Sequence, residues 1–567
     1  MEEALTQSHF QKRSFLTPDI CNSYFIEFEN RKKCLLCDKK YSKCTSATVL
    51  RNHLQKIHTN EIKVHEVIQN PVNLHDFPNA LISWIIEDFQ PFSVVESSSF
   101  QRLIATLAPN LEFPCRKSIA KLIKQEFEEK KQLEIKEFEK ITSKISLTLD
   151  LWTSDSSDSY IAILAHYIDP SWELKTKILT CCELEYPHTG ETIYQKLIEI
   201  TNIFSISYKI QSVTTDNAAN MVKGVQLFSR QLNENYGFTP IHYRCAAHIL
   251  NIVVQKGNFK KKFTLCKTRQ FVKRILDSPL LLNKLKKNQD DSNIALKPIL
   301  DCPTRWNSTF EMLKRFVQLE IPFRKFVVEV SSLEEFFPND EEIGEIRNLL
   351  ELLKPFSIAT KVLTQNKRCT MSYALVAFQG LKNVLHSHPH TNCLEMLQTL
   401  TRYAQNMEGS MLIPVFLDPQ VRDEYFHGSM EEFLPIIRNI YNLYSVQLPN
   451  SFRQDESKDD SEKISYFARF INKRVRMSCT TTHEIDRYLS IHPTGEIDIL
   501  VWWKSNSEEF PVLAMMAADF LGYQPTSAAC ERLFSLTKNM TDNTRNKLVP
   551  TTVEMITCLN KWKSVNY

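Results

Sequence analysis

The stretch Lys144-Ile-Ser-Leu-Thr-Leu-Asp-Leu-Trp152 decides the fold class of this chain. Apolar and polar side chains alternate along it from Ile145 to Asp150. A period of two residues is typical of a half-buried β-strand. The predicted strand ends with an acid, Asp150, so the same segment bears on the fold and on the function.

Two further strand-like segments follow closely, at residues 159–169 and 173–185. Three consecutive strands joined by short links predict an antiparallel meander. The pattern then predicts, in order, a helix over 189–204, a strand over 209–216, a helix over 217–232, a strand over 242–245 and a helix over 246–257. The last strands need crossover helices, so we expect them to run parallel to one another. The order βββαβαβ resembles that of the ribonuclease-H-like fold.

Three acids in short motifs predict the functional centre. Asp150 ends the first predicted strand and Asp216 ends the fourth, which are neighbours in a ribonuclease-H-like sheet, so both carboxylates are expected at one edge. Glu531 lies far downstream, in the first turn of a helix predicted to open near residues 525–527. Acidic oxygens gathered from remote segments are typical of Mg²⁺ sites for phosphoryl transfer on nucleic acid. For each acid alone, a cap or a surface charge is the simpler interpretation.

The motifs around these acids carry a family resemblance. They are Asp150 in DLWTS, Asp216 in TDNAANM, Cys245-Ala-Ala-His248 before Ile-Leu-Asn, Thr304-Arg305-Trp306-Asn307-Ser308, and a tail running from Ile497 through TSAACERLFS to Arg545 and Leu548. Taken in this order, they resemble the hAT superfamily of DNA transposases over residues 145–567. The ordered set is more specific than any single motif.

The resemblance implies a chemistry for the three acids. Asp150, Asp216 and Glu531 would form a DDE-type catalytic triad holding two Mg²⁺ ions about 3.5–4 Å apart, with Mn²⁺ as a substitute. The ions would activate a water or a 3′-hydroxyl and stabilise the leaving oxygen, so no protein nucleophile is required.

The resemblance also implies contacts with the DNA end. His248 would lie beside the active site, and Arg305 with Trp306 would act where a DNA hairpin forms, Trp306 stacking on a flipped base. By residue type alone, Trp306 is more often a core residue. Cys245 and His248 are too few for a second zinc site, so a core cysteine with a polar histidine is the alternative.

An amino-terminal segment has the spacing of a zinc module. Cys34 and Cys37 enclose two residues, and His53 and His58 enclose four on one face of a predicted helix. Four nitrogen and sulfur ligands match one closed, structural Zn²⁺ site. Cys44 does not fit the pattern.

The surroundings of this module predict DNA binding. Between residues 31 and 58, eight basic residues stand against one acid, and Lys32, Lys33, Lys39 and Lys40 are the candidates for phosphate contact. Aromatic residues at positions 24, 25 and 28 precede it, so the layout resembles a BED-type zinc finger, in which such aromatics pack on a small zinc-held core. A solvated basic face is the alternative.

A second basic run lies between residues 256 and 274, with eight basic residues and no acid. Such a run after the second crossover unit suits a DNA backbone path, with Lys260, Lys261 and Lys262 as its centre. A solvated face is again the alternative.

Composition excludes several classes of protein. The chain has 567 residues and a formal charge of +3, so nucleic acid must be bound through local patches. Its ten glycines are far apart, the closest pair being Gly224 and Gly237, which excludes Walker A, GxGxxG and GxSxG motifs. Fifteen cysteines, mostly scattered, read as reduced thiols. The sequence has neither a signal peptide nor a long apolar run, so we expect a soluble intracellular protein.

These observations predict a multidomain α+β protein: a ribonuclease-H-like core interrupted by a large all-α insertion and preceded by a zinc finger and a helical connector. We expect a BED-type finger at 1–70, a helical connector for DNA binding and dimerisation at 71–140, the opening half of the ribonuclease-H-like core at 141–265, the all-α insertion at 266–490, and the closing half of the core with a dimerisation segment at 491–567. Within the last two regions, residues 450–463 are predicted as a polar loop and Ile497–Lys504 as strand-like.

The leading hypothesis is a nuclear cut-and-paste transposase that works as at least a dimer. It would bind double-stranded DNA at terminal inverted repeats, cleave with a hairpin on flanking DNA, and join 3′-hydroxyls to target DNA. It would need neither a membrane nor a nucleotide cofactor. The alternative is a domesticated DNA-binding regulator without transposition activity. A ribonuclease acting on RNA–DNA hybrids fits the core alone, and the finger, the insertion and the Trp306 motif count against it.

Overall fold

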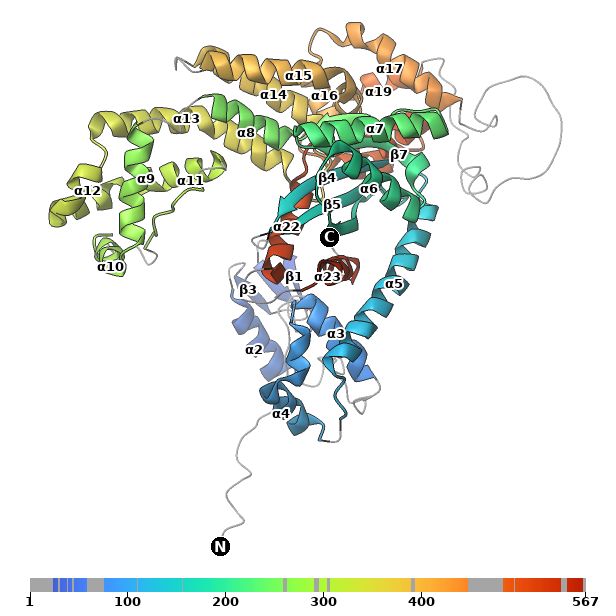
Figure 1. Ribbon diagram of the computed structural model, residues 1–567. Helices are drawn as coiled ribbons and strands as arrows, with labels where there is room; N and C mark the ends of the chain where they lie inside the picture. The colour runs from blue at the N-terminus through green and yellow to red at the C-terminus, as the bar shows by residue number, and fades with distance from the viewer. Residues whose placement is uncertain are drawn as a thin grey trace, which may run out of the picture. The chain divides into compact units, whose positions relative to one another are not determined.

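The protein is mixed α+β, with a sheet-containing region and many helices (Figure 1). The computed structural model describes residues 24–28, 31–37, 39–42, 45–58, 76–109, 111–154, 157–257, 263–289, 295–302, 306–388, 393–446, 483–493, 495–541 and 548–563. The chain divides into two compact units, residues 1–80 and 81–567. The predicted polar loop at 450–463 and Cys44 lie outside the described residues.

The smaller unit holds a three-stranded antiparallel sheet and a helix. Strands β1 (Phe25–Phe28), β2 (Arg31–Cys34) and β3 (Lys40–Ser42) pair in sequence order, and α2 (Ala47–Ile57) follows. Its core is small: Cys34, Leu50 and Leu54 are buried, with Tyr24, Phe25, Leu36 and Tyr41 packed against them. The predicted packing of upstream aromatics is therefore confirmed for positions 24 and 25.

The larger unit is built on a five-stranded sheet of order β6-β5-β4-β7-β8. Its strands are β4 (Ile145–Thr153), β5 (Ser159–Ile168), β6 (Leu174–Glu183), β7 (Ile210–Thr215) and β8 (Ile241–Arg244). Strands β4, β5 and β6 form an antiparallel meander, whereas β4, β7 and β8 run parallel. The predicted strand order and directions are confirmed.

Helices α6 (Gly190–Ile203) and α7 (Ala219–Tyr236) provide the crossovers from β6 to β7 and from β7 to β8, and α8 (Ala246–Lys256) follows β8. Helices α6 and α7 pack closely because Gly224 faces Ile193: a Cβ built on Gly224 would lie 2.9 Å from the Cβ of Ile193. This contact aligns the helix that follows Asp216 with the rest of the sheet.

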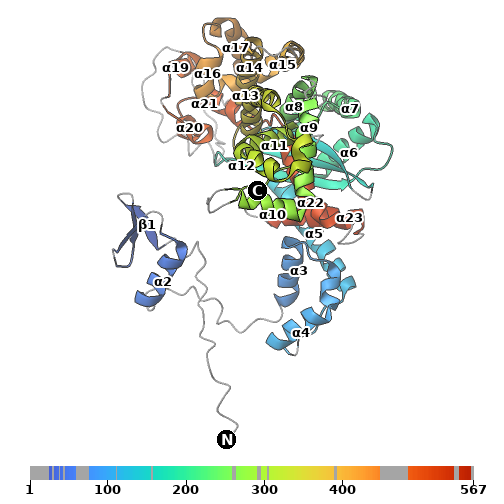
Figure 2. The ribbon, with the colours of Figure 1, turned by 90° about the vertical axis from the view of Figure 1, so that its left-hand side faces the viewer.

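Between α8 and the last part of the chain, every regular element in the described residues is helical, as predicted. These elements are α9 (Phe263–Leu276), α10 (Pro279–Lys287), α11 (Trp306–Gln318), α12 (Glu320–Glu329), η5 (Ser331–Phe336), α13 (Asp340–Leu363), α14 (Met371–Ser387), α15 (Cys393–Phe416), α16 (Pro419–Tyr425), α17 (Met430–Ser445) and α19 (Glu484–Leu489). Helix α13 begins at a capping box of Asn339 and Glu342. It contacts α9 and α11 on one hand and α14 on the other, so it joins the two helix groups seen in Figure 2.

The chain then returns to the sheet through α20 (Ile499–Asn506), α21 (Pro511–Phe520), α22 (Ala528–Thr541) and α23 (Pro550–Lys563). The strand-like interpretation of residues 497–504 is wrong, because α20 is a helix. Asp498 caps it by accepting hydrogen bonds from the Leu500 and Val501 N–H groups at 2.9 and 3.2 Å. A short apolar run does not distinguish a buried strand from a buried helix by periodicity.

Helices α3 (Phe77–Glu87), α4 (Ser98–Leu107) and α5 (Arg116–Lys140), with the 3₁₀ turn η2 (Phe92–Glu96), precede the sheet, so the helical character of this connector is confirmed. Helix α23 packs on α5 and β6, while α22 packs on β4 and β5. Among the described residues, no helix combines the length and apolarity needed to cross a bilayer.

Candidate functional site

Asp150 and Asp216 occupy matching positions on neighbouring parallel strands. In the pairing of β4 with β7, Thr148 lies opposite Thr214. Asp150 follows Thr148 by two residues on β4, and Asp216 follows Thr214 by two residues at the end of β7. The sheet register therefore brings the two acids to the same edge. Asp150 lies within β4 and not at its last residue, which is a small correction to the predicted strand end.

Glu531 comes from the other end of the chain. It lies in the first turn of α22, as predicted, and α22 packs on β4 and β5. Ser527, just before this helix, donates a hydrogen bond from its hydroxyl to Asp150 Oδ2 at 3.2 Å. The segment that carries Glu531 is thus attached directly to the first acid.

The charges of Asp216 and Glu531 act on Asp150. Burial raises the pKa of Asp150 to about 7, and the negative charges of Asp216 and Glu531 contribute to the rise. Hydrogen bonds from the Leu151 N–H, at 2.9 Å, and from Ser527 oppose the shift. Like charges that crowd one carboxylate in this way favour a proton or a cation at the centre of the group.

The donor set suits a hard divalent cation. Carboxylate oxygens are the ligands that Mg²⁺ prefers, and a cation would relieve the repulsion that raises the pKa of Asp150. Among the described residues, only the Cys34 cluster has all its ligand atoms within 4.8 Å of one another, so the three acids are more widely spaced than a closed single-ion cage. Wider spacing is compatible with a site that leaves room for substrate oxygens.

A neutral histidine lies behind the first acid. His166 on β5 is buried between two hydroxyls, those of Thr148 at 2.8 Å and Thr176 at 3.0 Å. Burial lowers the pKa of His166 to about 3, so its ring adds no charge at neutral pH. Thr148 and Asp150 lie on the same face of β4 because they are two residues apart.

Two residues near the acids, Ser527 and Arg244, were missed as functional candidates, and Cys245 was considered only as an incomplete zinc ligand or a core cysteine. Ser527 and Cys245 are buried and joined by a hydrogen bond, since the Ser527 N–H donates to Cys245 Sγ at 3.4 Å. Burial lowers the pKa of Arg244, at the end of β8, and the charge of Asp216 opposes that shift. Arg244 Nη1 is buried without a hydrogen-bond partner in the described part of the chain. One sequence signal could have indicated Arg244, because this residue directly precedes the predicted Cys245–His248 motif.

The residues expected at a DNA end have different environments. His248 is half-buried in the first turn of α8. Trp306 opens α11, is 5% exposed and packs edge-on against Phe356 within the helical core. A base cannot stack on Trp306 in this conformation, so that role stays a prediction that requires α11 to move. Arg305 lies outside the described residues.

The second basic run is largely engaged in contacts within the protein. Lys267 forms an ion pair with Glu342 at 2.8 Å, and Arg269 holds Asp301 through two hydrogen bonds of 2.7 Å. These contacts fasten α9 to neighbouring segments, so the expectation that the whole run faces DNA is wrong for these two residues. Lys260, Lys261 and Lys262 lie outside the described residues.

The smaller unit brings its four predicted ligands together. Ligand atoms of Cys34, Cys37, His53 and His58 all lie within 4.8 Å of one another. Cys37 Sγ lies 3.3 Å from His53 Nε2, and Cys34 Sγ lies 3.9 Å from His58 Nε2. These separations fit four ligands around one tetrahedral Zn²⁺ ion.

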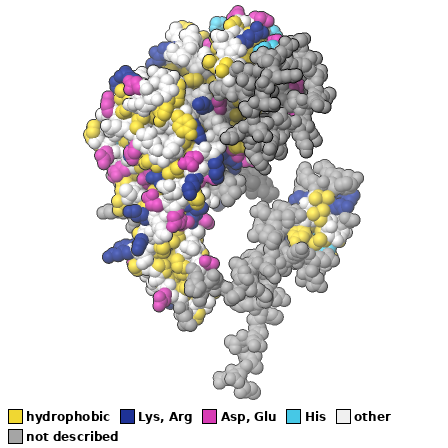
Figure 3. All heavy atoms as spheres, turned by 90° about the vertical axis from the view of Figure 1, so that its right-hand side faces the viewer, with side chains coloured by type: hydrophobic (Ala, Val, Ile, Leu, Met, Phe, Trp, Pro, Cys, Tyr) yellow, Lys and Arg dark blue, Asp and Glu magenta, His cyan; other side chains and the backbone are white. Residues whose placement is uncertain are grey.

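Basic side chains lie beside this cluster. Lys32 and Lys33 are half-buried on β2, while Lys39 and Lys40 are exposed near β3. Figure 3 shows Lys and Arg side chains next to hydrophobic ones on this unit. On the face of the larger unit seen there, basic and acidic side chains are interspersed.

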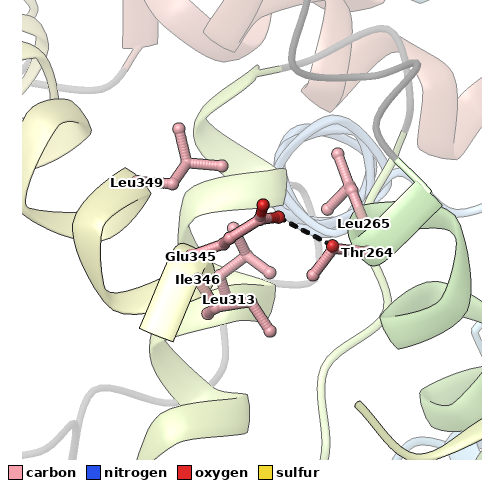
Figure 4. A pocket seen from close by; sticks show the side chains of 6 residues that line it. All are labelled: Thr264, Leu265, Leu313, Glu345, Ile346 and Leu349. Atoms are coloured by element: carbon pink, nitrogen blue, oxygen red, sulfur yellow. Dashed lines mark hydrogen bonds between the residues drawn. The ribbon is translucent and has the colours of Figure 1, made fainter. Parts of the chain in front are cut away.

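Two pockets in the described part of the chain are not lined by any of the three acids. One small pocket between α9, α11 and α13 is lined by Thr264, Leu265, Leu313, Glu345, Ile346 and Leu349 (Figure 4). Its one ionisable group, Glu345, accepts a hydrogen bond from the Thr264 hydroxyl at 2.8 Å.

Comparison with known families gives three matches. Residues 148–238 match a ZBED1 RNase-like domain, residues 243–352 match a ZBED1 RNase-like helical domain, and residues 484–563 match the hAT family C-terminal dimerisation region. The first match contains Asp150 and Asp216, and the third contains Glu531.

Comparison with curated proteins finds distant relatives along most of the chain. A putative AC transposase of Zea mays is 26% identical over 84% of this chain, and a putative transcriptional regulator, tpeD, of Talaromyces stipitatus is 27% identical over 84%. The zinc finger BED domain-containing protein DAYSLEEPER of Arabidopsis thaliana is 21% identical over 89% of the chain. The match spans 64% of the length of the maize protein, 60% of the fungal one and 74% of the Arabidopsis one.

Proposed function

The chain is a hAT-family transposase-like protein, and from this premise we propose that it cuts and joins DNA at the acidic cluster of Asp150, Asp216 and Glu531. The observation that carries the proposal is the β4–β7 register, in which paired Thr148 and Thr214 each lie two residues before an acid, together with the hydrogen bond from Ser527, just before the helix of Glu531, to Asp150. The strand order of the larger unit, three antiparallel strands followed by two parallel ones, supports a ribonuclease-H-like core.

In this proposal the acids are the ligands of catalytic Mg²⁺. Bound Mg²⁺ would polarise the scissile phosphate and supply a nucleophilic oxygen at neutral pH. Asp150 and Asp216 provide oxygens from adjacent strands, and Glu531 provides them from α22. Arg244 places positive charge beside Asp216. Asp150 must lose its proton before it binds metal, so its pKa of about 7 sets a pH requirement.

The rest of the chain would hold the DNA. The smaller unit, called the zinc-binding unit from here on for its Cys34, Cys37, His53 and His58 cluster, would contact phosphates through Lys32, Lys33, Lys39 and Lys40. His248 would lie near the cleaved end. A hairpin on flanking DNA would require Trp306 to leave its buried position. We also propose the five-part division at residues 70, 140, 265 and 490, a nuclear location, and at least a dimer, the last supported by the match to the hAT dimerisation region.

A second function has support of its own. One relative is named a transcriptional regulator and others are named BED-domain proteins. A DNA-binding regulator without cleavage activity would use the zinc-binding unit and would not need the three acids. The two functions differ in one measurable property, which is Mg²⁺-dependent nicking of DNA.

Excision from a plasmid that carries the terminal repeats flanking the gene tests the proposal. We expect Asp216→Asn to abolish excision and nicking while binding of end DNA persists. Glu234→Gln, which alters an exposed acid on the helix that follows Asp216, is the matched control and should excise normally. Excision that survives Asp216→Asn would remove the acidic cluster from the reaction. End binding without nicking by the unaltered protein would favour the regulator.

A further inference from the structure

We propose that Ser527 and Cys245 are positioning residues that fix the three acids relative to one another, an inference that rests on the proposed function. The acids come from β4, β7 and α22, and within the described residues no covalent or strand-pairing link joins α22 to either strand. Hydrogen bonds connect these segments away from the carboxylates, since Cys530 Sγ lies 3.5 Å from Thr148 Oγ1 and the Thr214 hydroxyl donates to the Gln524 carbonyl at 2.7 Å. A further series passes through Ser527 and Cys245 and reaches the Asp150 carboxylate and the residue before Asp216.

Ser527 links the first acid to the third. Its hydroxyl donates to Asp150 Oδ2 at 3.2 Å, and its carbonyl accepts the Glu531 N–H at 3.3 Å. A serine that precedes a helix usually turns its oxygen to the backbone N–H groups of that helix. The side-chain hydrogen bond of Ser527 is directed instead at a carboxylate on another element. Ser527 is 2% exposed and Asp150 is half-buried, so the bond is largely shielded from water.

Cys245 links the second acid to Ser527. Its N–H donates to the carbonyl oxygen of Thr215, the residue before Asp216, at 2.7 Å. Its sulfur accepts the Ser527 N–H at 3.4 Å, and the next residue, Ala246, donates its N–H to the Pro525 carbonyl at 2.8 Å. Two bonds therefore hold the start of α8 against the segment that leads into α22.

Such links matter because the acids repel one another. A catalytic constellation has to be held to about 0.5 Å, and residues that support ligands serve that purpose. The Ser527 hydroxyl occupies one of about four lone-pair sites on the Asp150 carboxylate, so lone pairs remain for a metal ion. The bond thus orients the carboxylate and does not block it.

The test measures Mn²⁺ binding by the full-length protein without DNA, with free Mn²⁺ read by electron paramagnetic resonance. The variants are Ser527→Ala, Cys245→Ala and Cys245→Ser, and Asp150→Asn reports the loss of an acid. Ser535→Ala is the matched control, because this serine lies on the same helix as Glu531 and donates to the Glu531 carbonyl at 2.9 Å, away from the carboxylates. Melting temperatures identify any variant that fails to fold.

We expect Ser527→Ala to weaken Mn²⁺ binding about 10-fold to 100-fold, the usual effect of removing a residue that supports a metal ligand. Cys245→Ala should weaken it too, and Cys245→Ser, which keeps an acceptor, should restore most of the affinity. Ser535→Ala should bind as the unaltered protein does. If Cys245→Ala fails to fold, Ser527→Ala alone decides the question.

Two contrary results are distinguishable. If Asp150→Asn loses Mn²⁺ affinity and folded Ser527→Ala does not, the positioning role is overturned and the proposed function stands. If the unaltered protein and Asp150→Asn bind Mn²⁺ alike, the acids hold no metal, and the proposed function is overturned together with this inference.

Discussion

At the scale of single residues, the environment of Asp150 makes a prediction about pH. Its pKa in the folded protein is about 7, whereas an unfolded chain has the ordinary value of 3.8. The folded state therefore binds the proton more tightly, so metal-free stability declines as pH rises from about 4 to about 7 and stays reduced above it. We expect Asp150→Asn to raise the melting temperature at pH 8 and to change it little at pH 4.

The measurement is thermal unfolding at pH 4 to 8 in buffer without Mg²⁺. Glu137→Gln, which alters an exposed acid paired with Lys140, is the control and should show no such pH dependence. Added Mg²⁺ should stabilise the unaltered protein more at pH 8 than at pH 6, because the metal displaces the Asp150 proton. An Asp150→Asn variant that is destabilised equally at all pH values would contradict the assigned pKa.

Single residues also show where sequence reasoning succeeds. Asp150 and Asp216 were predictable as neighbours because strand order and period fix which ends meet. Ser527 and Cys245 were not, because their hydrogen bonds join residues 377 and 282 positions apart, and a local pattern does not encode such contacts. Trp306 shows the opposite case, in which a motif suggested a surface role and apolar packing buries the side chain.

At the scale of elements, the zinc-binding unit depends on its ligands. Among its described residues, only Cys34, Leu50 and Leu54 are buried in the hydrophobic cluster, too few to hold a fold without a metal. We expect Cys37→Ser to unfold residues 24–58 and to leave the larger unit folded. Limited proteolysis with mass spectrometry would show cleavage confined to that segment.

The matched control is Cys115→Ser, which alters an exposed cysteine on the amino-terminal side of α5. It should leave the proteolytic pattern unchanged. A zinc-binding unit that stays protected after Cys37→Ser would show that zinc does not hold it together.

Helix α9 shows that a basic residue in a charged run can stabilise packing within the protein and need not face DNA. The side chain of Asp301 is 0% exposed and receives Arg269 and the Thr309 hydroxyl, so removal of Arg269 leaves a buried charge without its cation. We expect Arg269→Ala to lower the free energy of unfolding by about 3 kcal/mol, measured with urea. The salt dependence of DNA binding should not change.

Lys39 provides the contrast, since it is exposed on the zinc-binding unit. Lys39→Ala should leave the free energy of unfolding unchanged and reduce the slope of log K against log salt by about 1. Binding titrations of both variants at several salt concentrations separate the two roles. A reduced slope for Arg269→Ala would mean that this residue reaches DNA.

At the scale of the whole molecule, the strand order, the all-α region and the return of the chain to the sheet followed from the order of sequence patterns. The conformation of residues 499–506 did not, because the same apolar run satisfies a strand or a helix, and tertiary contacts decide. Trp503 is fully buried and donates its indole N–H to the Leu417 carbonyl at 2.9 Å. That contact links α20 to the end of α15, which no local pattern reveals.

The last prediction concerns helix α23. Residues 484–563 match a region named for dimerisation, yet α23 packs on β6 and α5 of its own chain. Trp562 donates its indole N–H to the Ile178 carbonyl at 3.0 Å and stacks on Phe127. Glu554 accepts the Thr180 hydroxyl at 2.6 Å. Helix α23 therefore supports the sheet of its own chain, and it also lies in a region associated with assembly.

We expect Trp562→Ala to lower the free energy of unfolding by about 3–5 kcal/mol, because a large aromatic side chain is removed from a packed site. The molar mass of the folded protein, measured by light scattering after size-exclusion chromatography, should not change. Val549→Ala, at a position 63% exposed just before α23, is the control for a change in the same segment without a packing loss. If Trp562→Ala dissociates the assembly at unchanged stability, α23 belongs to the subunit interface. The contacts to Ile178 and Phe127 predict the opposite. Because Trp562 packs within its own chain, its removal should lower the stability of the fold and not act on the subunit interface directly.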